Sequence, residues 1–287
     1  MIRSADLVDL SRIQRLLVGA NDEPYDIGRV AEEKCFGPGF EGQPEVRIFG
    51  DFEGLSVTCG KYLRLLAVDR SRRGRGVGSA LLRDAEARRA FVIGAEPGNY
   101  FTPGVSESLV PFFTKRGYRE TARTQNLICH SEPPQDGEES ASQERGGSFA
   151  VEACPEQAPQ ARVERAAQDD KHREAVLHFI EQNFGPIWRF EASRGAVLFS
   201  VEHDGQIAGF STHEANNRGL GTFGPAGVRE ALRGRGLGRK LLVASLADLS
   251  RLGYHRAVIP WTDAIEFYRK SCGAKIAHRF VILRKNA

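Results

Sequence analysis

The sequence lacks the features that mark secreted, metal-binding and membrane-spanning proteins. It has five cysteines in 287 residues, an odd number, and no two of them form a C-x-x-C pair. This pattern favours neither a disulfide framework nor a zinc site, so we expect no bound metal and a reducing, cytoplasmic compartment. No apolar run approaches the roughly 18 residues that a membrane-spanning helix needs. The charged first six residues also do not resemble a secretory signal.

A large excess of charge of one sign is also missing. Lysine and arginine number 40, and aspartate and glutamate number 37, which leaves a net charge of +3. We therefore expect no nucleic-acid partner and no membrane partner, although this balance does not exclude a local site for an anion. The run Arg-Ser-Arg-Arg at residues 70–73 is the basis of a weaker, nucleic-acid-binding alternative.

Residues 130–160 differ in composition from the rest of the chain. They are rich in Glu, Pro, Gln, Ser and Gly, and they carry seven acidic residues against one arginine. A segment this polar cannot bury a core, so we interpret it as a flexible acidic linker. The sequence therefore predicts an N-terminal domain over residues 1–129 and a C-terminal domain over residues 161–287, in line with the length of the chain.

The two predicted domains repeat one another. Residues 73–78 read Arg-Gly-Arg-Gly-Val-Gly, and residues 233–238 read Arg-Gly-Arg-Gly-Leu-Gly, at an offset of 160 residues. An apolar stretch typical of a strand precedes each hexapeptide, and apolar residues at helical spacing follow it. In the second copy these are Leu237, Leu241, Leu242, Leu246 and Leu249. Internal duplication therefore explains the two-domain length.

The remaining segments predict the same α/β fold with a mixed sheet in both halves. In the first half we expect helices at 6–18 and 110–116, and strands at 46–49, 55–59, 62–68 and 91–94. In the second half we expect helices at 169–183 and 263–271, and strands at 161–166, 196–202, 206–213, 219–228, 254–260 and 279–284. Asp204-Gly205 is a favoured hairpin turn between two of these strands.

The glycine-rich turn between strand and helix has a defined chemistry. Gly76 and Gly78 can adopt positive φ and leave no side chain in the way. Main-chain N–H groups of the turn and of the first helical turn then converge, and the helix dipole adds positive charge there. Such a nest suits an anion, above all a diphosphate, and the neighbouring arginines would add charge at its rim. Neither hexapeptide matches a P-loop or a dinucleotide-binding turn.

These turns resemble the acyl-coenzyme A-binding motif of the GNAT superfamily of N-acetyltransferases, Arg/Gln-x-x-Gly-x-Gly/Ala between a strand and a helix. The matching residues are Arg73, Gly76 and Gly78 in the first half, and Arg233, Gly236 and Gly238 in the second. Residues 264–274, Ala-Ile-Glu-Phe-Tyr-Arg-Lys-Ser-Cys-Gly-Ala, are similar to the family's final aromatic helix and glycine. The tandem arrangement is also similar in layout to the mycothiol synthase family.

The resemblance implies that acetyl-coenzyme A (acetyl-CoA) binds where two strands splay apart. Its pantetheine arm would lie along the strand before each turn, and its diphosphate would lie on the turn itself. The residues implied in cofactor binding are Leu66, Val68, Arg73, Gly74, Arg75, Gly76, Val77 and Gly78 in the first half, and Gly227, Val228, Arg233, Gly234, Arg235, Gly236, Leu237 and Gly238 in the second.

The resemblance also implies aminolysis of the acetyl thioester by a primary amine of a small molecule. In this family a tyrosine of the last helix often protonates the departing thiolate, and Tyr268 matches that position. Phe113 occupies the equivalent position in the first half and has no such proton. We therefore expect the second half to be catalytic and the first to be a degenerate copy that binds CoA or shapes the substrate cleft. His213 and Glu214 are equal candidates for the general base.

Three alternatives stay open at this point. Trp261 stands seven residues before the tyrosine, where the family often has an asparagine that bonds the pantetheine arm. It either walls the acceptor pocket, as a substrate-binding residue, or simply packs in the core. The whole protein is either an enzyme or a non-catalytic CoA-binding sensor or partner-binding module. It is either a monomer or a homodimer.

Overall fold

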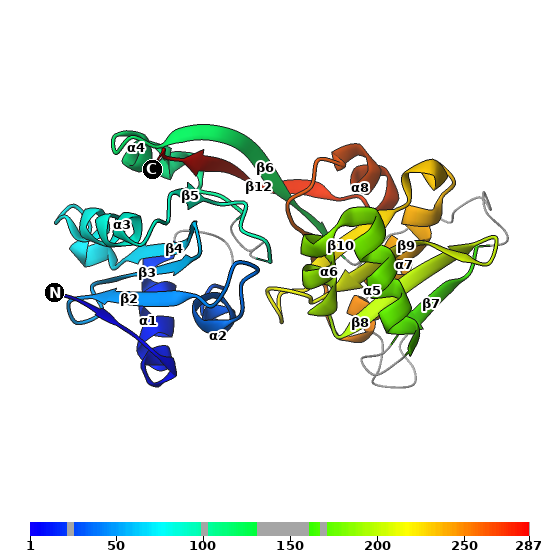
Figure 1. The fold of residues 1–287 in the computed structure, drawn as a ribbon, viewed down its shortest axis with the longest axis horizontal. Helices are drawn as coiled ribbons and strands as arrows, with labels where there is room; N and C mark the ends of the chain where they lie inside the picture. The colour runs from blue at the N-terminus through cyan, green and yellow to red at the C-terminus, as the bar shows by residue number, and fades with distance from the viewer. Residues whose placement is uncertain (22–25, 99–102, 131–160, 167–170, 287) are drawn as a thin grey trace, which may run out of the picture. The chain divides into compact units, whose positions relative to one another are not determined.

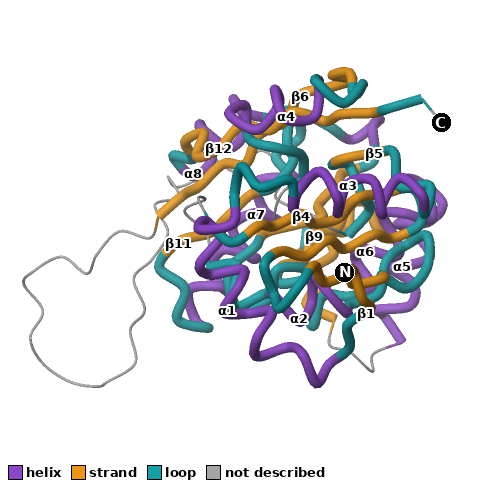
Figure 2. The backbone as a smooth tube through the Cα atoms, turned by 90° about the vertical axis from the view of Figure 1, so that its left-hand side faces the viewer, coloured by secondary structure: helices purple, strands orange, loops and turns teal. Residues whose placement is uncertain are grey.

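The computed structural model describes residues 1–21, 26–98, 103–130, 161–166 and 171–286, and the predicted linker lies almost entirely outside these ranges. The chain forms two compact units, and both units mix helices with strands (Figures 1 and 2). Unit 1 consists of Met1–Thr124 together with Arg279–Ala287, and unit 2 consists of Gln125–His278. These units differ from the predicted continuous halves at two places, near residue 125 and near residue 279.

The sheet of unit 1 is mostly antiparallel, and β4 and β5 form its parallel pair. Its strands, in order across the sheet, are β1 (Ile2–Ser4), β2 (Glu45–Phe49), β3 (Gly54–Cys59), β4 (Tyr62–Val68), β5 (Val92–Ile93) and β12 (Lys275–Arg284). Its helices are α1 (Leu10–Ala20), α2 (Ala31–Phe36), α3 (Val77–Ala87) and α4 (Val110–Thr114), with 3-10 turns at Leu7–Asp9, Arg70–Arg72 and Glu107–Leu109. The predicted elements are confirmed with small shifts at their ends, whereas the sequence does not predict β1, α2 or the long strand β6 (Arg119–His130).

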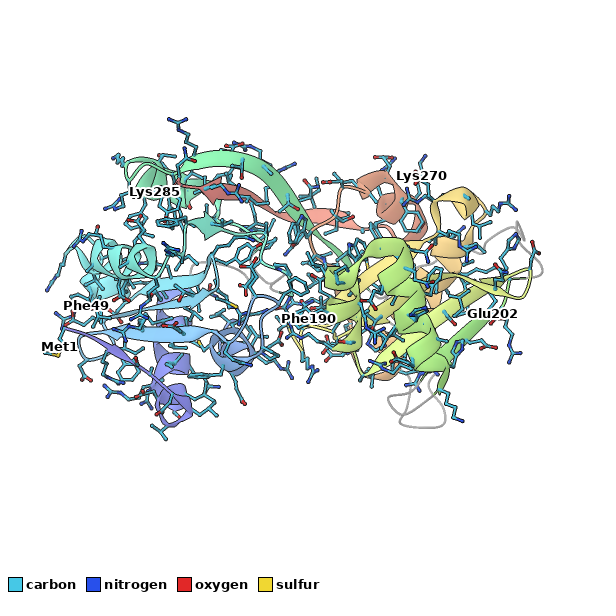
Figure 3. The ribbon with its side chains drawn as sticks, viewed as in Figure 1. Met1, Phe49, Phe190, Glu202, Lys270 and Lys285 are labelled. Carbon is cyan, nitrogen blue, oxygen red and sulfur yellow. The ribbon has the colours of Figure 1, made fainter. Side chains whose placement is uncertain are left out.

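The last strand of the chain, from Arg279 onward, belongs to unit 1. Leu283 of β12 pairs with Ile93 of β5 in antiparallel register and is fully buried. Lys285 (Figure 3) follows this strand and forms an ion pair with Glu86 of α3 at 2.9 Å. The sequence assigns residues 279–284 to the second half. The structure corrects this assignment, because the apolar side chains of the strand fill the core beside β5.

Unit 2 has a four-stranded antiparallel sheet in the order β10-β9-β8-β7. The strands are β7 (Val163–Ala166), β8 (Val197–His203), β9 (Gln206–His213) and β10 (Phe223–Val228), and β11 (Arg256–Ile259) pairs antiparallel with the end of β6 (Arg119–His130). The helices are α5 (Lys171–Phe184), α6 (Pro186–Ser193), α7 (Leu237–Arg251) and α8 (Ile265–Cys272), with a 3-10 turn at Glu230–Leu232. Asp204 and Gly205 both have left-handed φ, so the predicted hairpin turn is confirmed. The sequence predicts neither α6 nor the late start of β10 at Phe223.

Helices cover both faces of the sheet of unit 2. The Val228 side chain of β10 lies against Gly238 of α7, whereas a Cβ at Gly227 would meet the ring of Phe184 at the end of α5. Because neighbouring residues of a strand point to opposite faces, α5 and α7 lie on opposite faces of the sheet.

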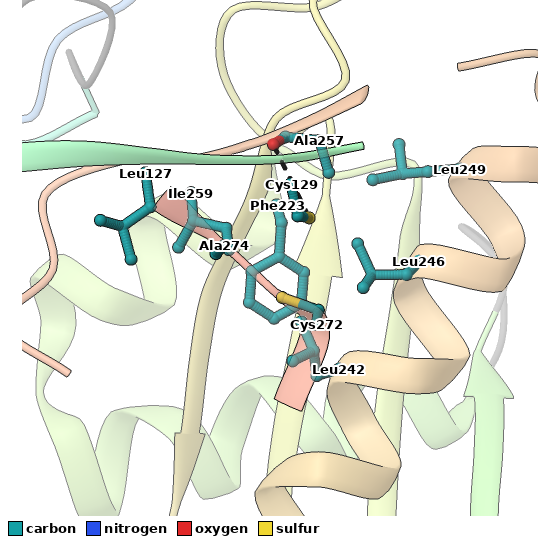
Figure 4. Packing of buried hydrophobic residues seen from close by; sticks show 10 residues of the cluster. All are labelled: Leu127, Cys129, Phe223, Leu242, Leu246, Leu249, Ala257, Ile259, Cys272 and Ala274. Carbon is teal, nitrogen blue, oxygen red and sulfur yellow. Dashed lines mark hydrogen bonds between the residues drawn. The ribbon is translucent and has the colours of Figure 1, made fainter. Parts of the chain in front are cut away.

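The core cluster shown in Figure 4 packs α7 against β6 and β11. Leu242, Leu246 and Leu249 form one side of α7 and are fully buried, as the leucine spacing predicts. Removing each of these side chains from water contributes about 1.5–3 kcal/mol. Leu127 of β6 is also fully buried in this cluster, which explains why residues 125–130 belong to unit 2.

No helix within the described ranges is both long enough and apolar enough to cross a membrane. Cys35, Cys59, Cys129 and Cys272 are free thiols and all four are buried, while Cys154 lies outside those ranges. Burial raises the pKa of the Cys35 thiol to about 12, so this side chain is a protonated core residue at neutral pH.

Replacing Leu283 with alanine should destabilise unit 1 and leave unit 2 unchanged. The substitution creates a cavity at a fully buried position, which typically costs about 2–5 kcal/mol. Both tryptophans, Trp188 and Trp261, lie in unit 2, so their fluorescence reports the unfolding of that unit. We expect faster hydrogen exchange in β5 and α4 and an unchanged fluorescence midpoint.

The matched control is Leu252→Ala, because Leu252 is 60% exposed and should change stability by less than about 0.5 kcal/mol. Faster exchange confined to unit 2 in the Leu283 variant would contradict the placement of β12.

Candidate active site

Both glycine-rich turns have the same backbone geometry. Gly76 precedes α3 with φ 85° and ψ −4°, and Gly236 precedes α7 with φ 77° and ψ −5°. Arg73 has φ −64° and ψ 152°, and Arg233 has φ −63° and ψ 157°. The sequence repeat is therefore a structural repeat, and each turn joins a strand to a helix as predicted.

The main-chain donors of each turn are open. Gly76 and Gly236 need to be glycine, because side-chain-bearing residues rarely adopt their left-handed φ. In the described part of the chain, no residue accepts a hydrogen bond from the N–H groups of residues 74–79 or 234–238. A Cβ built at Gly74 or Gly76 would meet no atom within 4 Å, so none of the described side chains fills the bend. Converging donors at the start of a helix suit an anion.

The first arginine of each hexapeptide holds the turn in place. Arg73 Nε donates to Val68 O at 3.3 Å, and Arg73 Nη2 donates to Ala20 O at 2.6 Å. Arg233 Nε repeats the first contact with Val228 O at 3.4 Å. These guanidinium groups therefore fasten the turn to the end of the preceding strand.

The second arginines, Arg75 and Arg235, are exposed. Arg235 Nη1 lies 3.2 Å from His203 Nε2 on β8. Leu237, which follows the second turn, is buried in the core at the start of α7, so only its main chain can face a ligand of the turn.

The parallel strands diverge in front of each turn. In unit 1, β4 pairs with β5 only at Tyr62–Val92 and Leu63–Ile93, although β4 continues to Val68. In unit 2, Thr222 forms a single parallel bridge with Val258, and β10 then continues to Val228 paired with β9 on its other edge. Beyond these pairings, no strand in the described ranges pairs with the facing main-chain edges of β4 and β10, which is the splay that the resemblance implies.

Unit 1 contains a cavity of about 580 Å³ along this diverging edge. It extends from β4 and the glycine-rich turn to α1, α4 and β12, and Phe280 of β12 forms part of its wall. All predicted cofactor-binding residues of the first half line it except Arg75. These are Leu66, Val68, Arg73, Gly74, Gly76, Val77 and Gly78.

A buried ion pair spans the point at which β4 and β5 separate. Arg64 Nε donates to both carboxylate oxygens of Glu96 at 2.9 Å, and the two side chains are 4% and 2% exposed. Arg64 Nη1 also donates to Gly37 O at 2.9 Å. The pair connects β4 to the segment after β5 and so fixes how far the strands diverge. The sequence gives no signal for it, because Arg64 stands in an apolar strand and Glu96 follows 32 residues later.

Tyr268 lies on α8 in unit 2, where the resemblance places a proton donor. Its ring packs edge-on against Phe223 of β10, with centroids 6.1 Å apart. Burial of the ring, with a smaller contribution from Cys272, raises the pKa of the phenol above its ordinary value. In the described ranges no residue hydrogen-bonds its hydroxyl. The group is therefore a protonated phenol whose proton is not engaged by a neighbour within those ranges.

The structure supports the equivalence of Phe113 and Tyr268. The preceding residues, Phe112 and Phe267, lie in the same position relative to the last glycine of each turn. A Cβ at Gly78 would lie 3.4 Å from Phe112 Cζ, and a Cβ at Gly238 would lie 3.6 Å from Phe267 Cζ. Phe113 is 4% exposed and belongs to the core of unit 1. Unit 1 therefore has no phenol at the position that Tyr268 holds in unit 2.

Glu214 holds a loop rather than facing a ligand. Its carboxylate accepts hydrogen bonds from the main chain of Gly219, from Thr222 N at 2.8 Å and from Tyr254 Oη at 2.8 Å. These bonds hold residues 214–221 in a loop, which explains why β10 starts later than predicted. Both oxygens have donors, so Glu214 is not positioned as a general base.

His213 also has structural contacts. It ends β9, is 2% exposed, and its Nε2 lies 2.9 Å from Asp248 Oδ2 of α7. Asp248 stands eleven residues after Leu237, which is about 16 Å along the helix from its start. His213 therefore packs β9 against the far end of α7, away from the open turn, and is not positioned as a general base either.

Trp261 follows the C-terminal end of β11, where β11 and β10 diverge. Its φ of 45° is left-handed, and its main-chain N–H donates to Asn126 Oδ1 of β6 at 3.0 Å. The side chain is half-buried. A wall position beside the divergence stays a prediction for this residue.

Two family models match the chain. The acetyltransferase (GNAT) domain matches residues 47–127, and the acetyltransferase (GNAT) family matches residues 163–274. Together the two matches cover more than half of the chain. The chain therefore belongs to the GNAT acetyltransferase family and contains two GNAT domains in tandem. This membership supports acetyl transfer from an acyl-CoA in general.

Solved structures show the same fold. The tandem GNAT protein from the clavulanic acid biosynthesis pathway has a TM-score of 0.66 at 16% identity, and the match covers 99% of this chain and 97% of that one. The GCN5-related N-acetyltransferase from Sphaerobacter thermophilus has a TM-score of 0.65 at 18% identity, with 99% and 95% covered. A glucosamine N-acetyltransferase region in a fungal multi-domain GH3 β-N-acetylglucosaminidase reaches 0.73 at 17% identity, and this chain spans 38% of that longer protein. The search of curated proteins found no match.

Replacing Gly236 with valine should weaken CoA binding by unit 2 at least tenfold. Valine is strained at φ 77°, and the turn must change shape to relieve a strain of about 1–3 kcal/mol. The change would turn the open amides away from one another. Isothermal titration calorimetry with CoA measures the loss.

Gly253→Val is the matched control for this variant. Gly253 has φ 86° and stands just after the other end of α7, with no atom within 4 Å of a Cβ built there. It carries the same backbone strain without touching the turn. Equal weakening of CoA binding by both variants would mean that lost stability, not lost turn geometry, causes the effect.

Proposed function

We propose that this protein is an acetyl-CoA-dependent N-acetyltransferase that acetylates the primary amine of a small molecule. The observation that carries the proposal is the pair of open main-chain turns, each placed where two parallel strands diverge. Family membership supports acetyl transfer from an acyl-CoA in general. The roles of the two units in this reaction follow from the geometry of their individual residues.

The residues of unit 1 fit CoA. The open N–H groups of residues 74–79 suit its diphosphate, and glycine at position 76 leaves the approach free. From the turn, the cavity follows the unpaired edge of β4, where main-chain groups can hydrogen-bond the amides of a pantetheine arm. Leu65 and Leu66 line this part and suit the methylene groups of that arm. When bound, acetyl-CoA supplies an acetyl carbon activated as a thioester.

Unit 2 has the residues for transfer. A primary amine that attacks the thioester carbonyl forms an amide, loses one proton to water and releases the coenzyme as a thiolate. The Tyr268 hydroxyl holds a proton that it can donate to that sulfur, because its raised pKa keeps the phenol protonated at neutral pH. A proton donor in the transition state typically contributes about 10²–10⁴-fold to a rate.

Unit 1 binds the coenzyme without transferring its acetyl group. Its turn and diverging strands match those of unit 2, but Phe113 replaces the tyrosine and is buried in the core. The proposal therefore assigns one chain two coenzyme sites, of which one is catalytic.

Replacing Tyr268 with phenylalanine should lower kcat roughly 100-fold and leave CoA affinity unchanged. The substitution removes the proton and keeps the ring that packs on Phe223. The measurement is the release of CoA thiol, followed with a thiol reagent, with acetyl-CoA and a panel of primary amines. Glucosamine is the first amine to test, because one structural neighbour is described as a glucosamine N-acetyltransferase region.

Tyr118→Phe is the matched control, since Tyr118 is a buried tyrosine of unit 1 and its loss should not affect turnover. An unchanged kcat in Tyr268→Phe would show that this residue is not the proton donor. CoA binding without turnover on every amine would instead favour the non-catalytic sensor.

The pH dependence of kcat offers a second test of Tyr268. A phenol whose pKa is raised above the ordinary value of about 10 keeps its proton throughout the neutral and mildly alkaline range. We therefore expect no fall in kcat between pH 7 and pH 10 from loss of this proton. A fall below pH 9 that disappears in the phenylalanine variant would contradict the raised pKa.

A further inference from the structure

One cationic side chain of the unit 1 cavity stands beside the open turn. Arg116 follows α4, is half-buried and lines the cavity. Its guanidinium lies over the ring of Phe112, 3.9 Å from the centroid, and its Nη2 donates to Ser79 Oγ at 2.6 Å. Ser79 is the third residue of α3, and its main-chain N–H is one of the open donors. Arg116 is thus held next to the converging amides rather than extended into solvent.

The charge of Arg116 is not neutralised by the protein. Its hydrogen bonds go to the hydroxyl of Ser79 and to the main-chain oxygen of Phe112. In the described part of the chain, no carboxylate forms an ion pair with it. Arg47, by contrast, pairs with Asp84 on α3 at 3.3 Å. A fixed guanidinium without a carboxylate partner, beside open amides, favours an anion from outside the protein.

We propose that Arg116 is the side-chain ligand of the CoA diphosphate in unit 1. The inference rests on the proposed function, since it assumes that this cavity holds the coenzyme. The planar guanidinium fork pairs with phosphate oxygens in a bidentate manner, and such charge-assisted bonds are stronger than neutral ones. Arg73, which the sequence predicts for this role, donates instead to main-chain oxygens of Val68 and Ala20.

Unit 2 has the same two residue types at the same helix interface in the opposite order. The residue that follows the last glycine of the hexapeptide is Ser79 in unit 1 and Arg239 in unit 2. The residue one helical turn after the equivalent phenylalanine is Arg116 in unit 1 and Ser271 in unit 2. Each unit therefore has one arginine at this interface, although a different helix or helix end supplies it. Two arginines that only face water would not need to be kept at this interface when the order of the residues is reversed. A common role in binding an anion explains why each unit keeps one.

The test is a calorimetric titration of the full-length chain with CoA and with dephospho-CoA, which keeps the diphosphate and lacks the 3′-phosphate. The titrations use a Gly236→Val background, so that the heat reports the turn of unit 1. We expect Arg116→Ser to weaken the binding of both ligands equally, by roughly 10- to 100-fold, the usual range for a lost charge-assisted hydrogen bond.

Two further variants separate binding from folding. Arg83→Met removes an exposed arginine from the same helix, α3, and should leave both affinities within about twofold. Arg116→Ser combined with Ser79→Arg recreates the order found in unit 2 and should recover most of the lost affinity. A merely structural role for Arg116 would not be rescued in this way. Circular dichroism confirms that each variant is folded.

The possible results distinguish this inference from the proposed function. If the background chain binds CoA and Arg116→Ser binds it within about twofold, the role of Arg116 is wrong and the coenzyme site stands. If only CoA, and not dephospho-CoA, binds more weakly, Arg116 contacts the 3′-phosphate and the assignment to the diphosphate is wrong. If the background chain binds neither ligand, the coenzyme site of unit 1 is wrong and the inference falls with it.

Discussion

Unpaired main-chain hydrogen-bonding groups are the feature on which both units depend. A folded chain pairs nearly all of its buried N–H and C=O groups, so a strand edge without a partner is an exception that requires a cause. Here β4 loses its parallel partner after Leu63, and the parallel bridge to β11 ends at Thr222, just before β10 begins. The turns that follow keep their amides open. The Arg64–Glu96 ion pair holds the separation in unit 1. A ligand with amide and phosphate groups, such as the coenzyme proposed above, would supply the hydrogen bonds that the sheet does not.

The duplication retains main-chain geometry more strictly than side chains. The two turns agree within about ten degrees at Gly76 and Gly236, where only glycine adopts the required φ without strain. The side chains around them differ, since Tyr268 faces Phe223 where unit 1 buries Phe113. Because main-chain amides form the greater part of the proposed anion site, a unit could lose a catalytic side chain and still bind the coenzyme.

The sequence predicts what local patterns determine. The two hexapeptides, the leucine spacing of α7 and the Asp204-Gly205 turn each fix a local conformation, and all three are confirmed. The placement of β12 in unit 1 is not predicted, because strand pairing joins residues far apart in sequence, such as Leu283 and Ile93. The contacts of His213 and Glu214 are missed for the same reason. Their side chains satisfy main-chain and helix groups that only the folded chain brings near them.

The last strand of the chain also links folding to ligand binding in unit 1. Phe280 lines the cavity, and Leu283 is buried in the core of the same unit, so the cavity wall exists only when β12 is docked. A ligand that binds only the docked state stabilises it, by about 2.7 kcal/mol when present at a hundred times its dissociation constant. That gain is comparable to the cost of a large-to-small substitution in the strand. Coenzyme bound to unit 1 would therefore hold the end of the chain in place, whether or not this unit transfers an acetyl group.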